Sequence, residues 1–129
     1  MVNDGKGGGY LRVLVVDDEE PCLEELIYLL SREQNVEIVG AFTNPLEALT
    51  ASAALKPDTA FLDLSMPHLN GAELARKLQA YFPGIRVIFV TSYAKELENV
   101  KDIPSNGSIL KPVSKTKIQN LLKCLSKVK

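Results

Sequence analysis

The sequence predicts a single α/β domain in which a parallel sheet carries helices on both faces, a doubly wound fold. Short apolar runs of strand length alternate with helical patterns along the chain. The central run, Thr59 to Asp63, lies between Pro57 and Pro67 and is typical of a buried parallel strand. It ends on a carboxylate that a buried strand does not need, and the carboxyl ends of such strands are where ligands bind.

Composition narrows the class of protein. The chain has 129 residues, 46% hydrophobic and 24% charged, which is ordinary for one globular domain. Its net charge of −1 shows no excess of positive charge, so we expect no direct contact with nucleic acid. No apolar run approaches the roughly 20 residues of a membrane span, and no secretory signal opens the chain. We therefore expect a cytoplasmic protein in which Cys22 and Cys124 are free thiols.

The amino-terminal part predicts a leader, a strand and a helix. Residues Met1 to Gly9 contain four glycines and little that can be buried, which indicates a flexible leader before a domain covering 10–129. Leu11 to Val16 is a β-branched run that stops at an acidic segment, Asp17 to Glu20. A helix is predicted from there to Arg32, because acidic residues and a proline suit its first turn.

The next elements follow the same alternation. Val36 to Phe42 is predicted as a strand, and Asn44-Pro45 caps a helix that reaches Lys56. After the central strand, Asn70 or Gly71 begins a third helix, which Pro83-Gly84 ends. The apolar residues expected to carry the second helix are Leu46, Leu49, Ala53 and Ala54.

The carboxyl-terminal part predicts two further strands. Ile85 to Val90 is a continuous apolar strand apart from one arginine, and Thr91 follows it. Tyr93 to Ile103 has a weak helical pattern. Ser108 to Leu110 is a short strand, after which Ser114 caps a final helix.

Five side chains are thus expected at one edge of the sheet: Asp17, Asp18, Asp63, Thr91 and Lys111. Converging carboxylates repel each other unless a cation joins them. Oxygen ligands without His or Cys suit Mg²⁺, which commonly binds one or two carboxylates together with phosphate oxygens. A lysine and a hydroxyl can complete a cradle for a phosphoryl group. The residues therefore predict Mg²⁺-assisted phosphoryl transfer with Asp63 as the acceptor.

Each of these residues also has an ordinary structural explanation when it is taken alone. The acidic run can cap a helix, Asp63 can form a turn, Thr91 can be a strand residue, and Lys111 can be a solvated cation. Their joint arrival at one edge of the sheet favours the functional interpretation. His68, alone in a loop, is interpreted as a surface residue.

Four motifs resemble the receiver domains of bacterial two-component response regulators, over roughly Leu11 to Val128. In chain order they are Val15-Val16-Asp17-Asp18-Glu19, the segment Phe61 to Gly71, Phe89-Val90-Thr91-Ser92, and Leu110-Lys111-Pro112. The resemblance implies a flavodoxin-like, five-stranded parallel sheet of strand order 2-1-3-4-5. It also implies a signalling domain that catalyses only its own phosphorylation and dephosphorylation, rather than a conventional enzyme.

The resemblance assigns roles to individual residues. A histidine kinase or phosphotransfer protein would phosphorylate Asp63. Asp18, Asp63 and the backbone carbonyl of Ser65 would bind Mg²⁺ directly, and Asp17 would act through water. Lys111 would pair with the phosphoryl oxygens.

The same resemblance predicts how the signal leaves the site. Thr91 would move to bind the phosphoryl group, and Lys111-Pro112 would be a cis peptide bond. A face formed by residues 93–103, 108–110 and 115–127 would bind a partner or a second copy of the chain. The motifs look most like receivers that precede LytTR-type DNA-binding domains, so an output domain beyond Lys129 is possible.

One position departs from the family. An aromatic residue usually stands three positions before the lysine and follows the movement of the hydroxyl residue, but here that position is Ser108. Activation must therefore be relayed in another way or be weaker. Tyr93 is a substitute by position, although an ordinary surface aromatic is the favoured interpretation.

Two other classes of protein stay open at this stage. A small Mg²⁺-dependent phosphatase also uses an aspartyl nucleophile, but it usually has a second acid two residues later, where this chain has Ser65. A binding module with a vestigial acidic site would be expected to have lost Asp63 or Lys111, and both are present.

Overall fold

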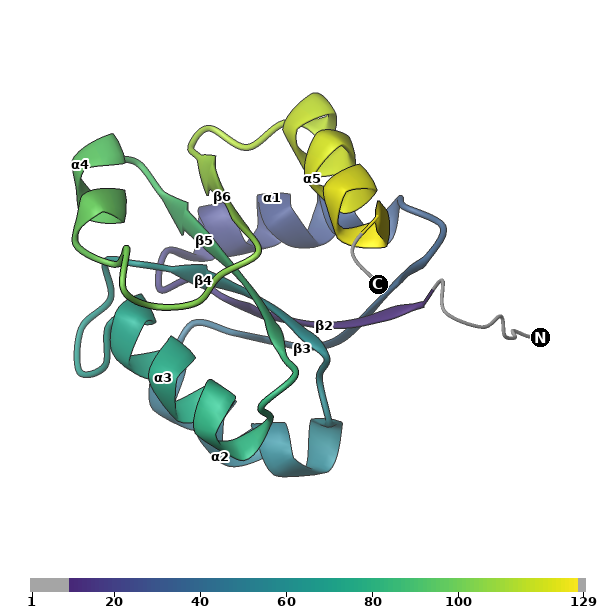
Figure 1. The fold of residues 1–129 in the computed structure, drawn as a ribbon. Coiled ribbons are helices and arrows are strands. Elements are labelled where there is room, and N and C mark those ends of the chain that lie inside the picture. Colours follow the sequence, from purple (N-terminus) through teal and green to yellow (C-terminus); the bar gives the residue numbers. More distant parts are fainter. Residues whose placement is uncertain (1–9, 128–129) are drawn as a thin grey trace.

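A computed structural model describes residues 10–127, so the expected leader at Met1 to Gly9 lies outside the described residues. The described chain forms a five-stranded sheet of order β3-β2-β4-β5-β6, in which all neighbouring strands are parallel (Figure 1). Numbered along the sequence, this is the expected order 2-1-3-4-5. The strands are β2 (Leu11–Val16), β3 (Val36–Phe42), β4 (Thr59–Asp63), β5 (Arg86–Thr91) and β6 (Gly107–Leu110).

Helices cover both faces of the sheet, as the alternating pattern predicts. Figure 1 shows α1 and α5 on one face, α2 and α3 on the other, and the short α4 beyond the end of β5. The helices are α1 (Glu20–Ser31), α2 (Pro45–Leu55), α3 (Gly71–Tyr81), α4 (Ala94–Glu98) and α5 (Lys115–Lys127). Within the described residues, no helix is long and apolar enough to cross a membrane.

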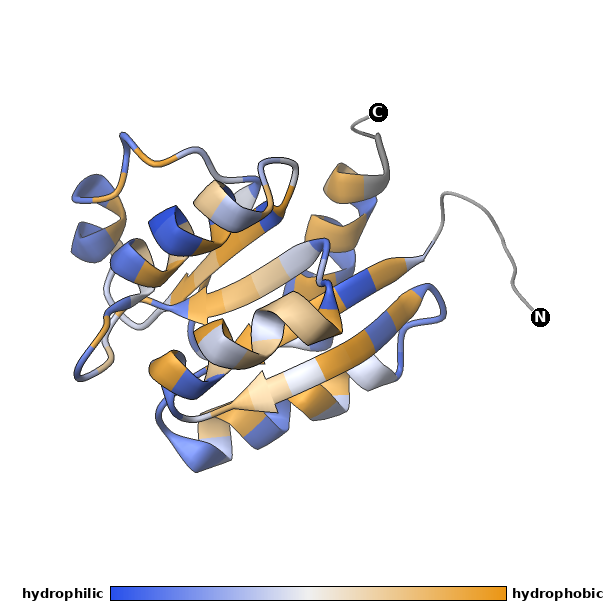
Figure 2. Cartoon of the chain, turned by 90° about the horizontal axis from the view of Figure 1, so that it is seen from below, coloured by the Kyte–Doolittle hydropathy of each residue, from blue (hydrophilic) through white to orange (hydrophobic). Residues whose placement is uncertain are grey.

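The central strand β4 contributes to two hydrophobic cores because its side chains point alternately to opposite faces. Phe61 packs with the residues of α1 and α5, whereas Leu62 packs with those of α2 and α3, and both are fully buried. Figure 2 shows strands that are mostly hydrophobic and helices that carry both hydrophobic and hydrophilic stripes. The two cores fix β4, and with it Asp63, at the middle of the sheet.

Local signals place the start of α3 next to the end of β4. Asn70 and Glu73 form a reciprocal capping box, in which each side chain accepts a hydrogen bond from the other's backbone N–H. At Gly71 a Cβ atom would lie 2.2 Å from the backbone oxygen of Asp63, so only glycine allows this approach. The loop between β4 and α3 is thereby held close to Asp63.

One sequence-based expectation, the inner face of the second helix, needs adjustment. The buried residues of α2 are Pro45, Ala48 and Ser52, whereas Leu46 is 49% exposed. A helix of small residues has no clear apolar stripe, so the sequence pattern was a poor guide to its inner face. The weak pattern after Tyr93 yields only five helical residues in α4, none of them buried.

Candidate functional site

Side chains from three strand ends meet at the carboxyl edge of the sheet. Asp17 and Asp18 follow β2, Asp63 ends β4, and Lys111 follows β6. The ammonium nitrogen of Lys111 lies 2.9 Å from Asp17 Oδ2 and 3.5 Å from Asp63 Oδ2. Asp17, Asp18 and Asp63 each offer a carboxylate oxygen within 4.8 Å of the others. One lysine thus faces three converging acids.

Burial makes it unfavourable for both Asp17 and Asp63 to be ionised. Asp17 is fully buried and Asp63 is 5% exposed. Asp17 Oδ1 accepts a hydrogen bond from the backbone N–H of Glu19, and Asp63 Oδ1 accepts one from that of Ser65. The buried Asp17 Oδ2 has only its ion pair with Lys111 and no well-aligned hydrogen bond. Two buried, ionised carboxylates need more positive charge and more hydrogen bonds than these partners supply.

The pKa values of these groups reflect the imbalance. Burial, followed by the charge of Asp17, raises the pKa of Asp63 to about 7, against the opposing effect of Lys111. Burial together with the charges of Asp17 and Glu19 also raises the pKa of Asp18. Burial alone would lower the pKa of Lys111, but contact with Asp17 and Asp63 outweighs it, so that pKa is raised. The lysine stays charged, and the acids lack a second cation.

The donor atoms suit a hard divalent cation. Asp17, Asp18 and Asp63 supply only oxygen ligands, and no histidine belongs to this group. A cation at this cluster would offset the repulsion that raises the pKa of Asp63. A second group, formed by Asp17, Glu19 and Cys22, shares one of these acids. Its thiol donates a hydrogen bond to Glu19 at 3.3 Å, and burial raises the pKa of Cys22.

Thr91 lies beside the acids, but its hydroxyl is directed elsewhere. It is almost fully buried at the end of β5, and its Oγ1 donates a hydrogen bond to Glu96 Oε1 of α4. The hydroxyl of Ser65 donates to Glu96 Oε2 at 2.6 Å. Sequence reasoning missed Glu96, because nothing in its weakly helical segment distinguishes it from Glu98. Only the folded chain shows that one of these acids reaches the site.

The remaining residues of interest lie around this edge. Ser108 is exposed on β6, and Tyr93 is 65% exposed, so neither side chain fills the place of a buried aromatic switch. His68 is exposed in the loop after β4, with a left-handed φ of 69°. The Lys111-Pro112 bond is cis, as the resemblance implies. Cys22 and Cys124 are free.

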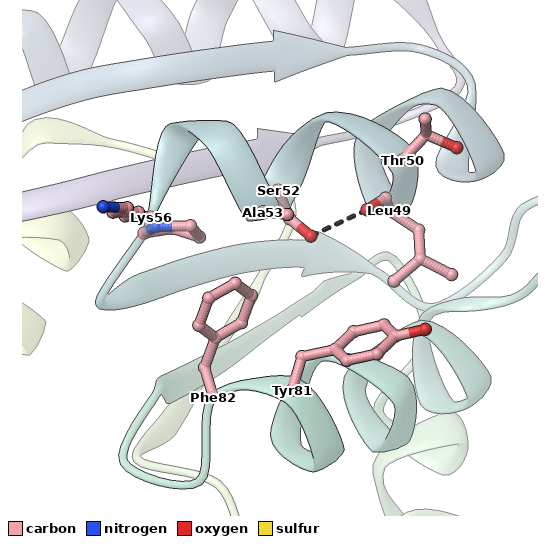
Figure 3. A pocket seen from close by; sticks show the side chains of 8 residues that line it. Leu49, Thr50, Ser52, Ala53, Lys56, Tyr81 and Phe82 are labelled. Carbon is pink, nitrogen blue, oxygen red and sulfur yellow. Dashed lines mark hydrogen bonds between the residues drawn. The ribbon is translucent and has the colours of Figure 1, made fainter.

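A separate hollow lies at the opposite edge of the sheet. It has a volume of about 770 Å³ and lies between the carboxyl ends of α2 and α3 (Figure 3). Leu49, Tyr81 and Phe82 line it, together with the charged residue Lys56. Because β4 begins near this hollow and ends at Asp63, the length of the strand separates it from the acidic site. Its lining contains no carboxylate and offers no evident chemistry.

The fold and the acidic site define a receiver domain of two-component signalling. The response regulator receiver domain family matches residues 13–123, so the chain belongs to that family. An uncharacterised response regulatory protein of Yersinia pestis is 38% identical over 117 residues, covering 91% of this chain and 49% of that protein. The sensory transduction protein LytT of Bacillus anthracis is 36% identical over 119 residues, covering 92% of this chain and 48% of LytT.

A solved structure shows the same architecture. The isolated receiver domain of RcsB from Salmonella enterica serovar Typhimurium, determined in the presence of the phosphomimetic BeF₃⁻, superimposes with a TM-score of 0.84. The two chains are 26% identical, and the match covers 93% of this chain and 91% of the other. The chain spans about half the length of the curated relatives it matches. It is a signalling domain rather than a conventional enzyme.

Proposed function

We propose that Asp63 is the residue that accepts the phosphoryl group. The observation that carries this proposal is the position of Lys111, whose ammonium group lies within 3.5 Å of both Asp17 Oδ2 and Asp63 Oδ2. A largely buried lysine beside an acid at the end of the central strand can hold the oxygens of a transferred phosphoryl group. Asp63 is also the one acid of the cluster that is part of a strand, whereas Asp17 and Asp18 lie in the loop between β2 and α1.

The transfer follows from the chemistry of a carboxylate nucleophile. An ionised oxygen of Asp63 attacks the phosphorus of the donor, forming the acyl phosphate P–O bond. The bond between phosphorus and the donor, a histidine nitrogen in a kinase or phosphotransfer protein, breaks, and its electron pair stays on the donor, which regains a proton from solvent. Lys111 stabilises the charge of the transferred oxygens throughout. Because burial and Asp17 favour the protonated form of Asp63, transfer requires conditions that ionise it.

We infer that Mg²⁺ is the cation that completes the site. Asp18 and Asp63, with the backbone carbonyl of Ser65, would hold it directly, and Asp17 would contribute through water. When bound, Mg²⁺ supplies positive charge for the phosphoryl oxygens. The support is the all-oxygen cluster of Asp17, Asp18 and Asp63, in which three carboxylates share the single ammonium group of Lys111.

The wider role follows from the same proposal. We place the domain in the cytoplasm, as the target of a histidine kinase or phosphotransfer protein. Residues 93–103, 108–110 and 115–127 form the proposed surface for an output domain or a second copy. The relative LytT is in line with the expected resemblance to receivers that precede LytTR-type DNA-binding domains.

Transfer from a small donor tests the proposal. The protein is incubated with Mg²⁺ and acetyl phosphate, and intact-mass spectrometry measures the added mass. We expect one phosphoryl group on the wild type and none on Asp63→Asn, with Asp102→Asn as the control. Asp102 is exposed, pairs with Arg76, and does not belong to the acidic cluster. Equal labelling of the wild type and Asp63→Asn would reject Asp63 as the acceptor.

A further inference from the structure

Two hydroxyl groups beside the proposed acceptor are bound by one carboxylate. Ser65 lies two residues after Asp63, and Thr91 ends the neighbouring strand β5. Ser65 donates to Glu96 Oε2 at 2.6 Å, and Thr91 donates to Glu96 Oε1. Each oxygen of Glu96 therefore has its own hydroxyl partner. The side chain bridges the loop after β4 and the end of β5.

The helix that carries Glu96 has few other attachments. No residue of α4 is buried, and Tyr93 caps its start without a side-chain hydrogen bond. Its apolar anchors are the partly buried Leu97, which packs against the core, and Val100 and Ile103, which follow the helix and are buried. Among the described contacts of residues 94–98, the side-chain hydrogen bonds that reach the sheet edge are those of Glu96. The position of α4 therefore depends on the apolar contact of Leu97 and on whether Glu96 keeps its two hydroxyl partners.

The Thr91 hydroxyl has one proton to donate. While the Thr91 hydroxyl donates its hydrogen bond to Glu96, it cannot donate one to a phosphoryl oxygen on Asp63. We propose that Glu96, with its hydrogen bonds to Thr91 and Ser65, is a positioning residue that holds the domain in its unphosphorylated arrangement, and that phosphorylation competes with it for Thr91. We call this pair of hydrogen bonds the latch. This proposal rests on the proposed function. It also gives a relay that needs no aromatic residue at Ser108, because Glu96 joins Thr91 directly to α4.

The competition makes a quantitative prediction. The probe is beryllofluoride with Mg²⁺, a stable mimic of the phosphoryl group, and ¹⁹F NMR measures its binding. Replacing Glu96 with alanine frees Thr91, so we expect the affinity for the probe to rise about tenfold, which corresponds to about 1.4 kcal/mol. This lies at the lower end for hydrogen bonds to a charged group, because Glu96 is half-buried. Hydrogen exchange in residues 93–99 should also quicken without the probe.

Matched variants separate the latch from simple loss of charge. Glu96→Gln removes the negative charge but keeps an oxygen that can accept one hydroxyl, so its affinity should lie between those of the wild type and Glu96→Ala. Glu98→Ala removes an equal charge from the same helix, where Glu98 forms a solvent-exposed ion pair with Lys101, and should change the affinity less than twofold. In a Thr91→Val background, Glu96→Ala should have no more than a twofold effect.

The outcomes distinguish this inference from the function on which it rests. A tenfold gain that persists with Thr91→Val, or equal gains for Glu96→Gln and Glu96→Ala, would overturn the latch and leave charge repulsion as the cause. An unchanged affinity in Glu96→Ala would overturn it as well. If the wild type did not bind the probe, or if Asp63→Asn bound it equally, the proposed phosphoacceptor site itself would be wrong. A gain confined to backgrounds that contain Thr91 supports the latch.

Discussion

Replacing Asp63 with asparagine should stabilise the metal-free protein at neutral and alkaline pH. The raised pKa of about 7 means that folded Asp63 still holds a proton between about pH 4 and pH 7, where the unfolded chain has released it. Folding therefore binds a proton in this window, and stability is lost as the pH rises through it. Asparagine has a similar shape and carries no charge, so the variant escapes this loss.

The size of the effect follows from the same numbers. The pKa of Asp63 rises from 3.8 to about 7, and a difference of one in pKa corresponds to about 1.4 kcal/mol. The full loss is thus on the order of 4 kcal/mol above pH 7. The favourable contact with Lys111 is already included in this pKa, and relaxation around the charged Asp63 reduces the loss, so we expect a net gain of about 2 kcal/mol. For a domain of this size, that raises the melting temperature by roughly 5–10 °C.

Thermal melts in chelator at several pH values from 4.5 to 8 measure the difference directly. The melting temperatures of the wild type and Asp63→Asn should lie close together near pH 4.5, separate steadily up to about pH 7, and keep a constant gap above it. Asp102→Asn, in an exposed ion pair, should differ from the wild type by a constant small amount. A gap between the wild type and Asp63→Asn that stayed constant over the whole range, or that closed as the pH rose, would refute the electrostatic reasoning.

Two further predictions concern the metal and the backbone. Asp18→Ala should remove most of the rise in melting temperature that Mg²⁺ produces, whereas Asp17→Ala should keep part of that rise. Thermal melts of both variants with and without Mg²⁺ measure the difference. A larger loss in Asp17→Ala than in Asp18→Ala would exchange the roles of the two acids. Gly71→Ala should lower the free energy of unfolding by about 1–3 kcal/mol, because its Cβ would lie 2.2 Å from the backbone oxygen of Asp63. Urea titration measures this against Gly84→Ala, where no atom lies within 4 Å, and equal stabilities would contradict the close approach.

The fold was predictable because its strands are unusually easy to recognise. Parallel strands buried on both faces read as continuous apolar runs, and β2 and β4 begin and end where their runs do. The parallel arrangement then brings the residues that follow these strands to one edge. The α2 helix was harder, because Ala48 and Ser52 face inward while Leu46 remains exposed, and no stripe in the sequence distinguishes them.

The site was predictable to the extent that it follows the strand ends. Asp17, Asp63 and Lys111 each stand directly beside a strand, so their proximity follows from topology. Glu96 follows a short helix whose position depends on tertiary contacts, and its bonds to Ser65 and Thr91 span 31 and 5 residues. Sequence pattern carries little information about such contacts. The latch could be inferred only from the folded chain.

The most direct test of the account is to locate the phosphoryl group after transfer. The protein is treated with acetyl phosphate in Mg²⁺ or in chelator, the acyl phosphate is reduced with borohydride, and peptide mass spectrometry finds the residue that has become homoserine. We predict reduction at Asp63 in Mg²⁺, with little in chelator and none at Asp17 or Asp18. Reduction at either of those acids in place of Asp63, or equal labelling without Mg²⁺, would contradict the proposed site.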